Sequence, residues 1–453
     1  MKLHEIRSGL AGRVNECASV LVIVLWISLG LVTIALYFAN SMTYELRAAD
    51  NRVSGLSAEQ AIEGAQRYVS YFLANYSTNG VFPTNMNFTC ENVPVGDAHY
   101  WIIGRDPSGD DPNDLHFGLI DEGSKLNLNY ANTNALSYLP NMTMDFAQAI
   151  MDWRGTNGTV SLDYTSLGYM AKNAAFETED ELRLVYGADT SLLFGDDLNC
   201  NGVLDANEKD TTGTGELNSG LLEYTTVYTR EPNFHSGGTM LTNVKNFTKE
   251  SQWQSFFQSA NVSGAKSVAQ SVYNSTSSRA VAGILDLAVR CRQAGMSASD
   301  FANIYTNATT TTNTYIRGRV NVNTAGEDVL TALFEGLNNG NDQTAESDAQ
   351  TLITYREQNP NLINSIGWVY DALGTGNSTL KLLQGGDYIT TKSFQFTADI
   401  AAVGAYGRGY RRVKFIFDIS NGAPIILYRQ DLSGLGWALG EKARQTLLAN
   451  NTQ

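Results

Sequence analysis

The chain has 453 residues and a net charge of −15, because 46 Asp and Glu residues outnumber 31 Lys and Arg residues. This acidic balance argues against nucleic acid as a partner, since phosphate binding requires an excess of basic side chains. The length leaves room for two or three domains with a sizeable core.

Residues 19–39 form an uncharged apolar stretch, long enough to cross a bilayer core at about 1.5 Å per residue. The leader before it, residues 1–18, carries basic side chains, which favours a cytoplasmic location for this end. Behind it, apolar residues recur at helical spacing, namely Ala58, Ile62, Ala65, Val69 and Phe72. We therefore predict one long helix over residues 19–76, apolar in front and amphipathic behind.

Three interpretations of the apolar stretch are open. A secretory signal peptide has a shorter apolar region and a small-x-small cleavage site, whereas a plain membrane anchor needs neither. A prepilin signal is cut before the apolar run, which stays on the mature chain. Ala18 and Ser19 offer such a cut, and Ile23 is then the fifth mature residue, where most pilins have Glu. A cut after Ala11 would make Glu16 the fifth residue but would leave an Arg in the mature helix, so we favour the Ala18–Ser19 bond.

Alternating aromatic and aliphatic residues predict antiparallel strands at two distant places in the chain. The strands are expected within residues 99–106, 114–129, 393–404, 410–420 and 423–431. Asn421-Gly422 predicts a hairpin between the last two, and a short polar helix follows from residue 437. The simplest architecture is one sheet interrupted by a long helical insertion.

The insertion contains an internal repeat. Two pairs of segments match in the same order: 125–136 with 319–330, and 147–154 with 349–356. The first pair shares a basic residue followed by alternating apolar and Asn positions, and the second shares an aromatic-Arg pair. Thr178 with Glu181, and Thr324 with Glu327, each match the capping box that begins a helix.

Such helix–hairpin–helix units often bind DNA phosphates, through a Gly-x-Gly hairpin with flanking basic residues. The hairpins here, residues 139–147 and 335–349, are polar or acidic instead. We interpret the two units as packing modules.

Residues 197–208, DLNCNGVLDANE, satisfy the calcium-loop pattern D-x-[DN]-x-[DN]-G-x5-E. The predicted ligands are five side chains and one backbone carbonyl: Asp197, Asn199, Asn201, Asp205 and Glu208, with the carbonyl of Val203. Gly202 permits the sharp turn at the sixth position. Hard oxygen donors at this spacing suit Ca²⁺, for which we expect a structural role; the alternative is an Asn- and Asp-rich turn without metal.

Other chemical signals are weak. Cys90, Cys200 and Cys291 remain after removal of the leader, which allows at most one intramolecular disulfide and leaves its pairing open. The four histidines are scattered without metal-ligand spacing. Ser263 and Lys266 match S-x-x-K, but the K-T-G partner motif is missing. We assign no enzyme activity and no catalytic residue.

Taken together, several segments resemble the K-type minor pseudopilin of the type II secretion system, the general secretion pathway protein K family. The resemblance runs in order over nearly the whole chain. It is carried by the apolar start with Trp26, MDWRG at 151–155, YMAKNAAFETEDELRLVYG at 169–187, LLEYTTVYT at 221–229 and RVNVNTAGEDVL at 319–330. Ala18 stands where the family more commonly has Gly before the cut.

The resemblance implies an α+β pilin fold, in which a long N-terminal helix packs on a small antiparallel sheet with a large α-helical domain inserted in it. It divides the chain into a prepilin leader, the transmembrane and assembly helix, two parts of the sheet with the insertion between them, and a C-terminal tail. These correspond to residues 1–18, 19–76, 77–130, 131–390 and 391–453, the last including the tail.

The resemblance further implies a single-pass inner-membrane protein with its soluble domain in the periplasm. It would be processed by prepilin peptidase and would assemble with I- and J-type minor pseudopilins at the tip of the pseudopilus that exports folded proteins. The calcium loop would be one of the family's Ca²⁺ sites. Two alternatives stay open: a minor pilin of a type IV pilus serving adhesion or DNA uptake, and a membrane-anchored calcium-binding surface protein.

Overall fold

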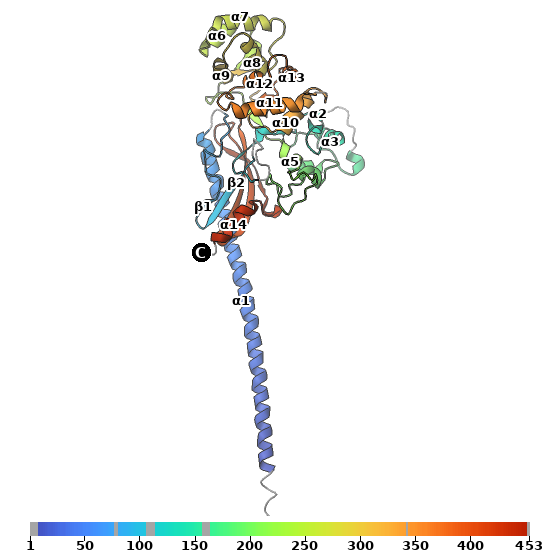
Figure 1. Cartoon of the computed structure of the whole chain (residues 1–453), viewed down its shortest axis with the longest axis vertical. Helices are drawn as coiled ribbons and strands as arrows, with labels where there is room; N and C mark the ends of the chain where they lie inside the picture. Colours follow the sequence, from blue (N-terminus) through green and yellow to red (C-terminus); the bar gives the residue numbers. More distant parts are fainter. Residues whose placement is uncertain (1–7, 77–79, 106–113, 156–163, 341–342, 451–453) are drawn as a thin grey trace, which may run out of the picture.

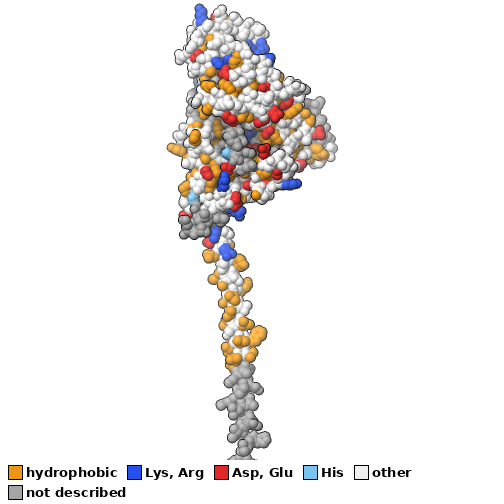
Figure 2. Space-filling view, in the orientation of Figure 1, with side chains coloured by type: hydrophobic (Ala, Val, Ile, Leu, Met, Phe, Trp, Pro, Cys, Tyr) orange, Lys and Arg blue, Asp and Glu red, His pale blue; other side chains and the backbone are white. Residues whose placement is uncertain are grey.

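The computed structural model describes residues 8–76, 80–105, 114–155, 164–340 and 343–450. Its first helix, α1 (Ser8–Tyr76), projects from the soluble body as a stalk (Figure 1). The helix therefore begins inside the predicted leader and ends at the predicted residue. Hydrophobic side chains are exposed along the stalk (Figure 2), and α1 is long and apolar enough to span a membrane. This finding is consistent with a single-pass anchor.

The sheet is assembled from both ends of the soluble body, as the sequence predicts. Its strand order is β1-β2-β12-β13-β14, all antiparallel, with β3 also paired to β12. The strands are β1 (Val93–Val95), β2 (Ala98–Ile103), β3 (Ile120–Asp121), β12 (Gln395–Gly404), β13 (Arg408–Asp418) and β14 (Ile425–Asp431). The hairpin at Asn421-Gly422 is confirmed, because Gly422 has φ +88° and donates its N–H to Ile419 O at 2.8 Å.

The expected strands in residues 114–129 are largely wrong. Only β3 and the two-residue β4 (Leu126–Asn127) form there, and β4 pairs in parallel with β5 (Thr225–Thr226) inside the insertion. A tight turn separates β3 from β4, in which the buried Asp121 carboxylate accepts the Gly123 N–H at 2.8 Å. This local bond ends the sheet strand early and directs the chain into the insertion.

The rear of α1 packs on one face of the sheet. Its small and branched residues Ala58, Ala61, Ile62, Ala65 and Val69 are buried at the helical spacing expected from the sequence. They meet a layer of sheet residues that includes Ala398, Ile400, Phe396, Phe415 and Phe417. The N-terminal part of α1 is thus exposed, and its C-terminal part is packed on the sheet.

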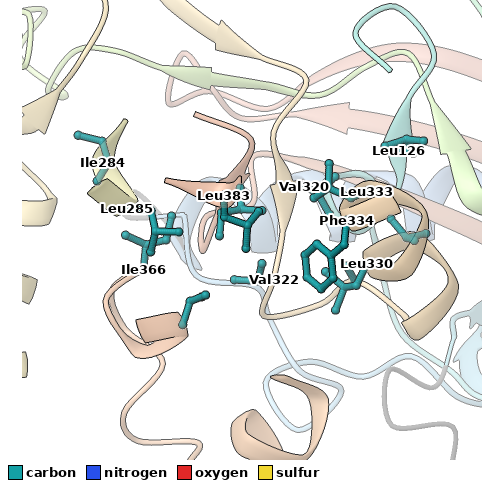
Figure 3. Close-up of a cluster of buried hydrophobic side chains, with 14 of the residues drawn as sticks. Leu126, Ile284, Leu285, Val320, Val322, Leu330, Leu333, Phe334, Ile366 and Leu383 are labelled. Atoms are coloured by element: carbon teal, nitrogen blue, oxygen red, sulfur yellow. The ribbon is translucent and has the colours of Figure 1, made fainter. Parts of the chain in front are cut away.

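Helices are the main regular structure of the insertion, and its buried apolar side chains form one core. Its helices of eight residues or more are α3 (Met144–Arg154), α6 (Glu250–Ser259), α7 (Ala265–Thr276), α8 (Ile284–Gln293), α9 (Ala298–Tyr305), α10 (Glu327–Leu337) and α11 (Ala345–Gln358). Shorter ones are α2 (Thr133–Ser137), α4 (Thr190–Phe194), α5 (Leu221–Tyr224), α12 (Trp368–Leu373) and α13 (Ser378–Leu383). Figure 3 shows two parts of this core: Val320 of β10 (Val320–Asn321) lies near Phe334 of α10, and Leu285 of α8 lies near Ile366 and Leu383.

The sequence repeat is a structural repeat. Arg154 in α3 and Arg356 in α11 each donate to two backbone carbonyls of their own unit. The accepting residues occupy matching positions, Leu128 and Ala131 in the first unit and Val322 and Ala325 in the second. Each unit also contains one short parallel strand pair, β4 with β5 and β10 with β11 (Ile389–Thr390).

The repeated asparagines have the same bonds in both units. Asn127 and Asn321 each use Oδ1 to accept a backbone N–H two residues ahead. Each uses Nδ2 to donate to a hydroxyl after the partner strand, Thr229 in the first unit and Ser393 in the second. The apolar-Asn-apolar-Asn pattern is therefore a fold signature of the strand-to-helix turn.

One of the two predicted capping boxes is wrong. Glu181 accepts the Thr178 N–H at 3.2 Å and begins a short 3₁₀ helix (Glu179–Leu184), as predicted. Thr324, however, is not a cap: α10 begins after Gly326, and the Thr324 hydroxyl donates to Asp121 Oδ2 at 2.6 Å. The buried Asp121 carboxylate therefore accepts the Thr324 hydroxyl, which the local pattern predicts as the cap of α10.

Candidate metal centre

The candidate calcium loop follows α4 and lies against the sheet rather than at the surface of the insertion. Asp197, Asn199, Asn201 and Val203 are buried, whereas Asp205 and Glu208 are partly exposed. Gly202 has φ +85°, so the sixth position of the pattern adopts the left-handed conformation that favours glycine.

All six predicted ligand residues lie in one hydrogen-bonded turn. Asp197 accepts the backbone N–H groups of Asn201 at 2.9 Å and Gly202 at 2.8 Å. Glu208 accepts those of Asn199 at 3.2 Å and Asp205 at 3.0 Å, one with each carboxylate oxygen. The first and last residues of the pattern therefore both fix the backbone between them.

The two asparagines organise the middle of the loop. Asn199 Oδ1 accepts the Asn201 N–H, and Asn201 Oδ1 accepts the Val203 N–H, both at 3.0 Å. Their Nδ2 groups donate to Asp205 Oδ2 at 2.6 and 2.9 Å. Asp205, the fourth predicted side-chain ligand, therefore bonds to both asparagines.

The oxygen donors of the loop are carboxylates, side-chain amides and a backbone carbonyl, which are the kinds that hard dications prefer. Burial raises the pKa of Asp197 to about 6, against the opposing effect of Arg105, and burial also raises the pKa of Glu208. Burial likewise raises the pKa of the Cys200 thiol to about 12, which keeps it protonated and unsuited to metal binding. Within the described residues no three Asp, Glu, His or Cys side chains form a metal-type cluster. A calcium ion here would therefore depend on amide and backbone oxygens as well as carboxylates.

Arg412 on β13 connects the loop to the sheet. Its side chain is fully buried, and its Nε donates to Asp399 Oδ1 on β12 at 2.8 Å. The rest of the guanidinium donates to the backbone carbonyls of Asn199 and Cys200, the latter at 2.7 Å. A buried guanidinium requires both a counter-charge and full hydrogen bonding. The ion pair of Arg412 with Asp399 and the hydrogen bonds of Arg412 to the loop carbonyls therefore depend on one another.

Arg105, just after β2, provides a second connection. It donates to the carbonyls of Cys200 and Asn201, both at 3.3 Å, and pairs with Glu223 of α5 at 2.7 and 2.9 Å. The loop is therefore bonded to β13 through Arg412 and to the segment after β2 through Arg105, which also pairs with the helix that follows the loop.

The C-terminal tail covers the loop from another side. Asn199 Nδ2 donates to the carbonyl of Trp437 at 3.2 Å, and Asn201 Nδ2 to that of Ala438 at 3.3 Å. Sequence reasoning missed the contribution of Arg105, Arg412 and this tail, because nothing in the local pattern marks partners more than 90 residues away.

The remaining sequence candidates do not combine into a site. Ser263 and Lys266 are exposed at the start of α7, with the Ser263 N–H donating to Asp300 at 3.3 Å. The predicted cleavage residues Ala18 and Ser19 lie within α1. Comparison with protein-family models found no matching family, and comparison with curated proteins found no match.

The contacts of Arg412 predict a large effect of removing it. In Arg412→Met, Asp399 stays buried without its counter-charge and two loop carbonyls lose a donor, so we expect a loss of about 3–5 kcal/mol. Thermal unfolding of the detergent-solubilised chain should show a midpoint lowered by several degrees. The matched control is Arg408→Met, which removes a half-exposed pair with Asp50 at 3.7 Å and should cost about 1 kcal/mol or less. Equal midpoints for the two variants would contradict this assignment.

Proposed function

We propose that this protein is a K-type minor pseudopilin, which helps to initiate the type II secretion pseudopilus from its tip and thereby serves export of folded proteins. The observation that carries the proposal is the arrangement of α1, the sheet and the insertion. One apolar helix runs unbroken onto an antiparallel sheet whose two halves flank a large helical domain in the chain. This is the arrangement expected of a pilin-like fold with an inserted domain.

The two-part helix supports assembly within a membrane. The front of α1 exposes a run of large apolar side chains, including Leu21, Leu25 and Trp26, which lipid or neighbouring apolar helices can cover. The rear is fixed on the sheet by tightly packed alanines. A subunit of this shape can move from lipid into a bundle of like helices without repacking its soluble body.

Ile23 supports a position at the tip. It occupies the fifth place after the proposed cut and exposes an aliphatic side chain on α1. A carboxylate there would neutralise the free amino terminus of a neighbour inside the membrane, where an unpaired charge is costly. A first subunit has no earlier subunit to dock beneath, so it can omit this carboxylate.

The insertion supports the same position. In Figure 1 its helices α6–α9 occupy the end of the molecule farthest from the stalk, so they would obstruct a further subunit from stacking above. The two repeated units contact each other through the ends of α2 in the first unit and residues 335–349 of the second: Asn132 donates to Gly336 O at 2.8 Å, and Tyr138 to Gly340 O at 3.1 Å. This contact favours the packing role of the units over DNA binding.

We further propose that Asp197, Asn199, Asn201, Asp205 and Glu208, with the carbonyl of Val203, hold a structural Ca²⁺. The ion would supply positive charge to a turn that buries carboxylates. The chain itself supplies the rest of the stabilisation, because Arg105 and Arg412 hold the backbone of the same turn against the sheet.

A calcium titration tests this part of the proposal. Glu208→Gln keeps the size of the side chain but removes one carboxylate charge, and should weaken Ca²⁺ binding by about tenfold or more. Glu216→Gln, at an exposed position outside the pattern, should leave affinity unchanged. Isothermal titration calorimetry of the detergent-solubilised chain measures both. Equal affinities would exclude the loop as the site.

Processing and co-isolation test the pseudopilin proposal. With prepilin peptidase present, the intact mass of the membrane-extracted chain should correspond to a start at Ser19, and without it to a start at Met1. The processed chain should co-isolate with I- and J-type minor pseudopilins. Ala18→Leu, with a bulky residue before the cut, should abolish processing while the chain remains in the membrane. A chain that keeps its leader and never co-isolates with such partners would contradict the proposal.

A further inference from the structure

The C-terminal segment after β14 covers the face of the sheet opposite α1. Ala438 and Leu439 are buried against Trp101, Ala401 and Val403 of β2 and β12. The segment continues into α14 (Gly440–Asn450), which lies where the stalk leaves the soluble body (Figure 1). The tail therefore covers an apolar strip that would otherwise face water.

The tail's own anchorage on the sheet is small. The Trp437 ring packs near Tyr410 with a centroid separation of 5.1 Å, and its Nε1 bonds within the tail to Gly440 O. The ion pair between Lys442 and Asp114 is exposed, so it contributes little. Apart from the buried Ala438 and Leu439, the tail side chains that pack on this strip, namely Trp437, Ala443 and Leu447, are only partly buried, which is a modest basis for ordering a chain terminus.

The calcium loop supplies the missing backbone partners. The carbonyls of Trp437 and Ala438 accept hydrogen bonds from Asn199 Nδ2 and Asn201 Nδ2. A side-chain amide has its oxygen and nitrogen on opposite sides, and both amide oxygens are held inside the turn by backbone N–H groups. The conformation of the loop thus decides whether the two donors point at the tail.

We propose that residues 437–450 form a latch, whose docking on the sheet depends on Ca²⁺ in the loop. This inference rests on the calcium site proposed above. Without the ion, repulsion among the carboxylates of Asp197, Asp205 and Glu208 loosens the turn, the two amides lose their fixed direction, and the tail detaches. Detachment exposes Trp101, Ala401 and Val403 on the face of the sheet opposite α1.

Hydrogen exchange of the full chain in detergent tests the latch. Peptides covering residues 437–447 should exchange about tenfold to thirtyfold more slowly in saturating Ca²⁺ than in chelator, the protection that two hydrogen bonds provide. In Glu208→Gln, exchange in the tail should respond to Ca²⁺ only at concentrations high enough to fill the weakened loop. Glu208 itself bonds within the turn, so this variant reports on the ion rather than on a lost tail contact.

Asn201→Asp separates calcium binding from latching. Aspartate is accepted at this position of the calcium-loop pattern, so a Ca²⁺ titration of the variant gives the concentration that fills its loop, and exchange is measured above that concentration. The variant lacks the Nδ2 donor to Ala438 and places a negative oxygen near a carbonyl, so most of the calcium-dependent protection of the tail should disappear. Asn207→Asp adds the same charge at an exposed loop position and should keep full protection.

Each outcome is decisive. If the wild-type chain binds Ca²⁺ but its tail exchanges at the same rate with and without it, the latch is wrong and the calcium site stands. If Asn201→Asp binds Ca²⁺ and keeps full protection, the amide coupling is wrong. If the wild-type chain does not bind Ca²⁺, the calcium site and the latch both fail.

Discussion

The buried pair of Arg412 and Asp399 is the constraint on which the junction of this molecule depends. A guanidinium with no solvent exposure needs a counter-charge and partners for all its donors. Asp399 on the neighbouring strand supplies the charge, and the carbonyls of Asn199 and Cys200 supply the remaining acceptors. The carboxylate comes from the sheet and the two carbonyls come from the insertion, about 200 residues earlier in the chain. Neither part alone supplies all the partners that Arg412 needs.

This constraint connects the assembly helix to the rest of the chain. The rear of α1 packs on β12 and β13, the same two strands that carry Asp399 and Arg412 toward the opposite face. A force or contact on α1 therefore reaches a sheet whose other side holds the loop, the insertion and the tail. In a secretion pseudopilus, such a rigid connection would let a membrane helix position a bulky head.

Much of the fold follows from local sequence patterns. The apolar run predicts α1, and the alternation of side-chain types predicts β12 and β13. Asn421-Gly422 predicts the hairpin that joins β13 to β14. The repeat can be seen in the sequence because Arg154 and Arg356 each donate to backbone carbonyls at equivalent positions of their units. A local pattern fails where a group far away in the sequence binds the same side chain. The Thr324 hydroxyl, predicted to cap α10, donates to Asp121 instead. Of the candidate site, the sequence predicts the loop and its ligand residues, but not the arginines and tail that surround it, because these contacts depend on tertiary structure.

Calorimetry of the processed, detergent-solubilised chain can show whether the loop unites the sheet and the insertion into one cooperative body. With saturating Ca²⁺ we expect a single unfolding transition. With chelator we expect this transition to move to lower temperature and to separate into two, one for the sheet with α1 and one for the insertion. Identical profiles in the two conditions, or two separate transitions in the presence of Ca²⁺, would contradict this role of the loop.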